Sequence, residues 1–225
     1  MRTFKLLPLL ALLASAACAP GYSELRRGKD VYGNFQALKA ANTEGLDYSR
    51  EVYARGAAVS VFAIHGGDIE TATSRVARHV AGKDFNLYLF NGWHGESGDL
   101  HVTAARFDDP DALRLAAAAT LGVSIHAQAD RGTWICVGGS NTEAARLTVR
   151  RLLAAGFSAE TPCPRMPGVS RENLVNRPAA GGVQLELTLR LLANLETDEE
   201  NLAIFSEAVR MAVLEALQLT APNSN

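Results

Sequence analysis

The chain has 225 residues, of which 48% are hydrophobic and 20% charged, which is the composition of a globular protein with a substantial core. Its formal net charge of −2 at pH 7 argues against a protein that binds nucleic acid by neutralising phosphates. We therefore expect no nucleic-acid partner.

The first 18 residues have the pattern of an export signal. Basic residues precede an apolar run, Leu6–Leu13, and small residues lead to Cys18. The apolar run is too short for a membrane-spanning helix. Ser15-Ala-Ala-Cys18 resembles the bacterial lipoprotein cleavage box, which would make Cys18 the lipidated first residue and a membrane attachment point. Cleavage near Ala17, giving a free secreted product, is the alternative. In both cases we expect a protein of the periplasm or cell envelope.

Helical and strand-like patterns alternate after the leader. Strands are predicted at 57–64, 85–90, 100–104, 123–126, 133–137, 157–161 and 183–188, and helices at 35–41, 69–81, 109–121, 141–155 and 198–219. A long loop with four prolines, Pro162–Gly182, separates two of these elements, and loops of this length are often functional. The alternation predicts a single α/β domain over 19–225, with helices flanking a mixed, mostly parallel sheet. We expect this domain to be a monomer.

Two cysteines remain if Cys18 is lipidated. Cys136 lies in a strand-like run and Cys163 follows the next one. In an oxidising compartment they could form a disulfide, but two unpaired thiols fit the sequence equally well because spacing carries no geometry.

The segment from Val59 to Glu70 carries the strongest functional signal. An apolar, strand-like run ends at His65, two glycines turn the chain, and a helical pattern begins near Glu70. This places an imidazole and a carboxylate at the carboxyl edge of a sheet, where open α/β folds carry their sites. A second apolar run ends at His126. One strand-end histidine is usually structural, but two of them with a carboxylate predict a zinc site.

The carboxylate of this site is not decided by spacing. Asp68 and Glu70 both follow His65 closely, and Asp68 could instead cap the following helix. Glu186 is a further candidate, because it alternates with apolar residues along the strand at 183–188 and shares a face with Gln184. That face is either solvated or part of a site, and the sequence leaves both open.

Six short motifs in order resemble the poly-γ-glutamate hydrolase family, some members of which are labelled phage-related replication proteins. They are His65-Gly-Gly-x-Ile-Glu70, Asp99-Leu-His101-Val-Thr103, Ser124-Ile-His126, Val137-Gly-Gly139-x-Asn141, Asn173-x-x-Asn176-Arg177 and Gly182-Val-Gln-Leu-Glu186-Leu. The resemblance covers the chain from about Asp30 to Leu192. It implies an amidohydrolase that uses one zinc ion and has a fold similar to the zinc carboxypeptidases.

Carried over by position, the resemblance makes His65, Glu70 and His126 the zinc ligands and favours Glu70 over Asp68. The carboxypeptidase pattern places the catalytic glutamate at Glu186. The carboxypeptidases space their first histidine and glutamate more closely than this chain does, so that part of the analogy is loose.

The expected reaction is hydrolysis of a γ-glutamyl amide. Glu186 would act as the base, and Arg177, or failing that Arg75, would stabilise the oxyanion. The alternative for Arg177 is a surface residue on a loop. His101 is expected to line the cleft, against the substrate or against a metal ligand, and Asn176 to contact the substrate. The substrate would be an acidic γ-glutamyl chain, matched by arginines around the metal. The alternatives are a peptidase acting on γ-glutamyl links of peptidoglycan stem peptides and a non-catalytic envelope-anchored binding domain.

Overall fold

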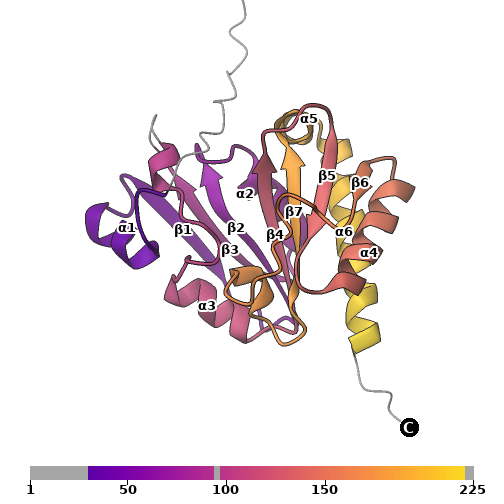
Figure 1. The fold of residues 1–225 in the computed structure, drawn as a ribbon, viewed down its shortest axis with the longest axis horizontal. Helices are drawn as coiled ribbons and strands as arrows, with labels where there is room; N and C mark the ends of the chain where they lie inside the picture. Colours follow the sequence, from indigo (N-terminus) through magenta and orange to yellow (C-terminus); the bar gives the residue numbers. More distant parts are fainter. Residues whose placement is uncertain (1–29, 94–96, 221–225) are drawn as a thin grey trace, which may run out of the picture.

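The computed structural model describes residues 30–93 and 97–220 (Figure 1). The expected leader and Cys18 lie outside these residues. The described chain forms one seven-stranded sheet in the order β1-β3-β2-β4-β7-β5-β6. The strands are β1 (Tyr48–Tyr53), β2 (Val59–Gly67), β3 (Asn86–Gly92), β4 (Leu121–Gln128), β5 (Trp134–Gly138), β6 (Ser158–Glu160) and β7 (Gly182–Thr188).

The sheet is mixed and mostly parallel, as the sequence predicts. Strand β2 pairs in parallel with β3 and β4, β4 pairs in parallel with β7, and β5 pairs in parallel with β6. Two pairs are antiparallel, β1 with β3 and β5 with β7. The central strands are buried along nearly their whole length, which explains their almost continuous apolar character.

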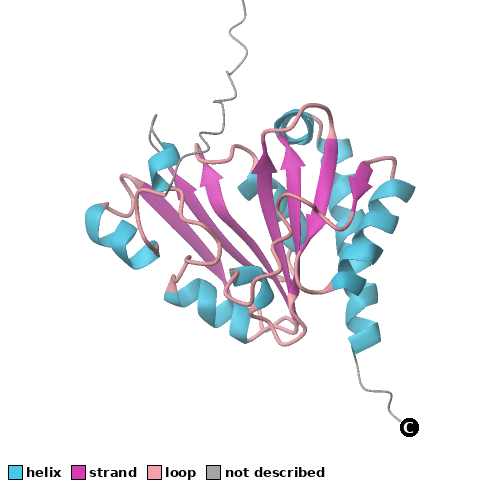
Figure 2. Cartoon of the chain, in the orientation of Figure 1, coloured by secondary structure: helices cyan, strands magenta, loops and turns pink. Residues whose placement is uncertain are grey.

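Helices cover both faces of the sheet (Figure 2). The helices are α1 (Phe35–Ala41), α2 (Thr73–Ala81), α3 (Pro110–Ala117), α4 (Thr142–Ala154), α5 (Leu189–Thr197) and α6 (Glu199–Thr220), with short 3-10 helices at Ser97–Leu100 and Leu174–Asn176. Helices α2, α4, α5 and α6 pack on one face, and α1 and α3 pack on the other. None of the helices in the described part of the chain combines the length and apolar character that crossing a membrane requires.

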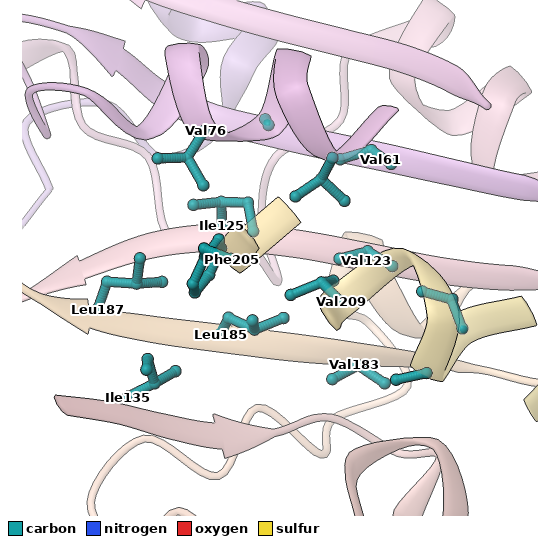
Figure 3. Packing of buried hydrophobic residues seen from close by; sticks show 14 of the residues in the cluster. Val61, Val76, Val123, Ile125, Ile135, Val183, Leu185, Leu187, Phe205 and Val209 are labelled. Atoms are coloured by element: carbon teal, nitrogen blue, oxygen red, sulfur yellow. The ribbon is translucent and has the colours of Figure 1, made fainter. Parts of the chain in front are cut away.

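The larger core lies between the sheet and helices α2, α4, α5 and α6. Figure 3 shows Ile125 of β4 and Leu185 of β7 meeting Phe205 and Val209 of α6 in this layer. All four side chains are buried. Because strand residues alternate between faces, the neighbours of Ile125 and Leu185 point to the opposite side of the sheet.

That opposite side is polar over β4 and β7. Helices α1 and α3 pack against β2 and β3, and their core cluster includes no residue of β4 or β7. The buried polar side chains of β4 and β7 are Ser124, His126, Gln128, Gln184, Glu186 and Thr188. The loop between β6 and β7 crosses in front of these strands (Figure 1). The fold therefore leaves a polar, loop-covered half-face beside an apolar, helix-covered one.

The predicted strand at 100–104 is wrong. This segment is irregular, and its backbone groups bond to side chains and to backbone groups outside the sheet instead of to a strand. The Val102 carbonyl lies 3.0 Å from His65 Nε2, and the Thr103 N–H donates to Asp30 Oδ2 over 2.9 Å. Its conformation is therefore set by contacts that are distant in the sequence.

Two elements are present that the sequence pattern did not reveal. Strand β1 is an edge strand with a mostly polar sequence and only its first residue buried, so it lacks the expected alternation. Helix α5 follows β7 directly, without a glycine or proline to mark the boundary.

The predicted start of the helix at 69–81 is four residues early. Helix α2 begins at Thr73 and not near Ile69, since a turn precedes it.

Candidate active site

Three side chains converge where the sheet reverses its winding. His65 lies near the end of β2, His126 near the end of β4, and Glu70 in the turn between β2 and α2. The chain leaves β2 for β3 on one side, whereas β4 lies on the other side of β2. Such a switch point leaves a crevice at the carboxyl ends of the strands.

A β-bulge turns His65 toward this crevice. Ala63 pairs with Leu89 and Gly66 with Asn91, so β2 advances three residues while β3 advances two. In a regular strand alternate residues share a face, so His65 would point to the side of Ala63, which belongs to the large core. The bulge therefore moves the imidazole to the face that carries His126.

Glycines make the following turn possible. A Cβ atom at Gly66 would lie 1.8 Å from Ser74 Oγ and 3.0 Å from the Phe90 carbonyl oxygen, so a larger residue would force its neighbours to shift. Gly67 has a φ of +67°, in the left-handed region that glycine favours, and a Cβ atom there would lie 2.3 Å from the Gly92 carbonyl oxygen. The Glu70 N–H then donates to the His65 carbonyl over 2.7 Å, which closes the turn and brings the two side chains together.

The potential ligand atoms of His65, Glu70 and His126 all lie within 4.8 Å of one another. His65 Nδ1 is 3.0 Å from Glu70 Oε1 and 3.1 Å from His126 Nδ1. Glu70 Oε2 accepts the Ala127 N–H over 2.9 Å. All three side chains are buried, whereas Asp68 is exposed, so the carboxylate in this cluster is that of Glu70.

The donor set of this cluster suits a divalent cation such as zinc. His65 Nε2 lies 3.0 Å from the Val102 carbonyl, which can only accept, so as a metal ligand His65 would keep its proton on Nε2 and bind through Nδ1. The lone pair on His65 Nδ1 then faces a carboxylate and a second imidazole nitrogen. Three potential ligand atoms converge here, and two histidines with a glutamate are a known catalytic zinc set.

The electrostatics of the cluster are consistent with a charged carboxylate. Burial raises the pKa of Glu70, but the adjacent His65 and His126 more than offset it, so this pKa lies well below its usual range. Burial lowers the pKa of His126, and the hydrogen bond and negative charge of Glu70 outweigh that effect and raise it.

Glu186 faces the cluster from the next strand. It pairs with His126 across β4 and β7, so both side chains project from the same side of the sheet. Its side chain is buried, and its Oε1 accepts a 2.7 Å hydrogen bond from Gln184 Nε2. Burial raises the pKa of Glu186 to about 7, with His126 and Gln184 acting in the opposite direction and Glu70 in the same one. The sequence left open whether the face of β7 that carries Glu186 is solvated or part of a site. In the structure this face is buried and belongs to the candidate site.

These groups line a cavity of about 850 Å³. One wall is the stretch 166–170 of the loop that crosses β4 and β7. A disulfide between Cys136 and Cys163 attaches the beginning of this loop to β5, and the Gly139 N–H donates to the Pro167 carbonyl over 2.8 Å. Cys136 is also the cross-strand partner of Glu186. The disulfide therefore anchors the loop that forms the cavity wall next to Glu186, the candidate base.

His101 lines the cavity, as the sequence analysis expects. Its ring stacks on that of His65 with centroids 4.0 Å apart, and its Nδ1 lies 2.7 Å from Asp30 Oδ1. Asp30 also accepts hydrogen bonds from the Thr103 N–H and from Arg106. The charge of His65 and burial lower the pKa of His101 to about 4. Asp30 thus holds a largely neutral imidazole against a potential metal ligand.

The arginines do not lie where the sequence analysis expects them. Arg75 is exposed on α2 and pairs with Glu199, and Arg177 is exposed and donates to the Glu172 carbonyl over 3.2 Å. Neither lines the cavity. Among the described residues around the cavity there is no arginine or lysine, so the prediction of arginines around the metal is wrong for this part of the chain.

Asn176 also has a different place from the one expected. It is absent from the cavity lining, and its Nδ2 donates to the carbonyls of Gly168 and Ser170, over 2.6 and 2.8 Å. Its Oδ1 accepts the Ser140 N–H over 2.9 Å. Asn176 therefore shapes the loop that forms the wall and does not itself face the cavity.

The lining residues that were not selected from the sequence include Gln184, Asn173 and Asp30. Gln184 could have been found, since it lies two positions from Glu186 on the same strand face. Asn173 belongs to one of the motifs but lies in an irregular loop, where no periodicity indicates the direction of a side chain. Asp30 lies close to His101 only because of the tertiary fold, 71 residues away in sequence. Nothing in the local pattern identifies it.

The sheet, its switch point and the buried cluster together define a protein of the α/β class with a candidate metal centre. The chain belongs to the poly-gamma-glutamate hydrolase family, whose model matches residues 32–204. The UPF0714 protein YndL of Bacillus subtilis (strain 168) is 37% identical over 164 residues, which are 71% of this chain and 64% of that protein. The chain thus spans less than two thirds of this relative's length.

Two solved structures have the same fold. A bacteriophage poly-gamma-glutamate hydrolase superimposes with a TM-score of 0.80 at 32% identity, covering 85% of this chain and 100% of that one. A zinc-free apo form of YNDL superimposes with a TM-score of 0.77 at 32% identity, covering 84% of this chain and 99% of that one.

Proposed function

We propose that this protein is a zinc-dependent hydrolase that cleaves the γ-glutamyl amide bonds of poly-γ-glutamate. The observation that carries the proposal is the buried convergence of His65, Glu70 and His126 on one point, with Glu186 beside it. Membership of the poly-gamma-glutamate hydrolase family supports the substrate class. A related structure that is called zinc-free supports zinc as the metal.

The described residues would divide the chemistry between them. Held by His65, Glu70 and His126, zinc would supply Lewis-acid polarisation of the scissile carbonyl and of the attacking water. Glu186, as a carboxylate, takes a proton from that water and later gives it to the leaving nitrogen. A pKa near 7 suits a group that must both accept and release a proton at neutral pH.

We also propose that the protein works outside the cytoplasm, in the periplasm or envelope, with lipid attachment at Cys18. The leader pattern supports export, and the disulfide between Cys136 and Cys163 supports an oxidising compartment. The proposed partner is an acidic γ-glutamyl polymer or peptide.

Metal analysis combined with hydrolysis assays tests the proposal. The purified protein should contain one equivalent of zinc, cleave poly-γ-glutamate, lose activity on chelation and regain it with zinc. Glu186→Gln should keep the zinc and lower kcat by about 10²–10⁴-fold, the range of a general base. Glu172→Gln, the same change on an exposed part of the loop, should alter neither zinc nor kcat.

A second substrate completes the experiment. Stem peptides of peptidoglycan contain a γ-glutamyl amide as well, so they should be assayed in parallel. Cleavage of the stem peptides alone would contradict poly-γ-glutamate as the substrate, but hydrolysis of a γ-glutamyl amide would still be the reaction. Cleavage of neither substrate by the zinc-loaded protein, or full activity of Glu186→Gln, would overturn the proposed function.

A further inference from the structure

The carboxylate of Glu186 ends a buried chain of side-chain hydrogen bonds. Asn173 Nδ2 donates to Gln184 Oε1 over 2.8 Å, and Gln184 Nε2 donates to Glu186 Oε1 over 2.7 Å. The three residues are 6%, 6% and 5% exposed, and all of them line the cavity. Hydrogen bonds in so dry a setting orient the groups they join more strongly than hydrogen bonds in water.

The donor-to-acceptor direction of this series of hydrogen bonds is fixed at Asn173. Asn173 precedes the short helix Leu174–Asn176, and its Oδ1 accepts the Val175 N–H over 3.3 Å. The amide of Asn173 must therefore present its NH₂ group to Gln184, which in turn must present its own NH₂ group to Glu186. In both of these amide hydrogen bonds the donor points toward Glu186, and Asn173 Nδ2 also donates to the Gly168 carbonyl over 3.3 Å. The chain thus ends on an oxygen that can only accept a hydrogen bond.

The cavity wall holds Gln184 in place. Gly168 has a φ of +61°, and a Cβ atom there would lie 2.7–2.8 Å from the amide atoms of Gln184, so the bare backbone packs against this amide. Asn176 anchors the Gly168 carbonyl from the other side. Gln184 therefore has a donor on one side, the loop backbone on another and Glu186 at its end, and its amide has no room to turn.

We propose that Asn173 and Gln184 are positioning residues that aim Glu186. The one-way chain of donors fixes Oε1 in place and leaves Oε2 as the oxygen that exchanges the proton with water and with the leaving nitrogen. Loss of the chain lets the carboxylate rotate and share its proton between two oxygens, which lowers the fraction of productive encounters. This inference rests on the proposed function, because it explains how Glu186, the base of the proposed reaction, is oriented.

Isosteric variants test the chain. Gln184→Met keeps the length of the side chain and removes both hydrogen bonds, and Asn173→Asp replaces the donor to Gln184 by an acceptor. Each should lower kcat about ten- to a hundredfold, the usual effect of losing a group that orients a catalytic residue, with KM and zinc content unchanged. If Gln184→Met does not fold, Asn173→Asp tests the same series of hydrogen bonds independently.

Ser124→Ala is the matched control. Ser124 is the cross-strand partner of Gln184, it is equally buried, and its hydroxyl makes no hydrogen bond with the described residues. Its removal should leave kcat unchanged. Wild-type kcat in Gln184→Met and Asn173→Asp would overturn the inference, as would a rise in KM at constant kcat.

A spectroscopic measurement separates this inference from the proposed function. In protein labelled with ¹³C at the glutamate carboxyls, the signal of Glu186 is identified by its loss in Glu186→Gln. It should move in Gln184→Met and stay in Ser124→Ala, in zinc-free as well as zinc-loaded protein. An unmoved signal refutes the positioning chain, even in an active enzyme. A moved signal in a protein that hydrolyses no γ-glutamyl amide refutes the proposed function alone.

Discussion

Replacing Cys136 and Cys163 together by alanine would remove the covalent link between β5 and the cavity wall. The link closes a loop with a sequence separation of 27 residues. A cross-link of that span lowers the entropy of the unfolded chain by the equivalent of about 3.5 kcal/mol at 25 °C. We therefore expect the free energy of unfolding of the double variant to fall by about 3.5 kcal/mol. For a protein of this size, Tm should fall by about 7–14 °C.

Urea unfolding followed by circular dichroism measures this change. A reductant should destabilise the wild type by a similar amount and leave the double variant unaffected, because the variant has no bond to lose. A fall of less than about 1 kcal/mol would refute the loop-entropy reasoning. It would mean that the unfolded chain is already compact in this region, or that the native loop relaxes when it is released.

Further predictions follow from the core, the turn and Asp30. Phe205→Ala empties a fully buried position and should lower the free energy of unfolding by about 3–5 kcal/mol in urea titrations, and a loss below 1 kcal/mol would contradict this packing. Gly66→Ala places a Cβ atom 1.8 Å from Ser74 Oγ, so we expect a lower zinc stoichiometry by elemental analysis. Burial raises the pKa of Asp30, but the Thr103 N–H and His101 lower it further, to below 3.8. Asp30 therefore stabilises the fold above pH 3.8, and that contribution disappears as the pH falls through the lower folded pKa. Asp30→Asn should show a weaker loss of stability on acidification, and an unchanged acid dependence would exclude this contribution.

The central fold and the cluster could be predicted because their signals are local. His65 and His126 end apolar strands, and parallel neighbours bring such ends together at one sheet edge. Glu186 alternates with core residues, although only the resemblance to a family indicated that its face belongs to a site. Its burial comes from the covering loop, whose path no periodicity specifies.

The remainder depends on contacts between distant parts of the chain. Arg75 and Arg177 lie in segments that were placed correctly, yet the direction of a long, flexible side chain depends on which acceptor lies within reach. For Arg75 that acceptor is Glu199, 124 residues away in sequence. Strand β1 is specified mainly by its pairing with β3 at the edge of the sheet, and not by its own pattern.

The extra residue in β2 has a consequence for anyone who wishes to transplant this centre. Grafting the two histidines and the glutamate onto a regular parallel sheet would send the first imidazole into the hydrophobic layer behind it. A designer must copy the irregularity between Ala63 and Gly66 together with the ligands. Copied with the same spacing but without the bulge, the strand could still pair with its neighbours, but its histidine would point away from Glu70 and His126.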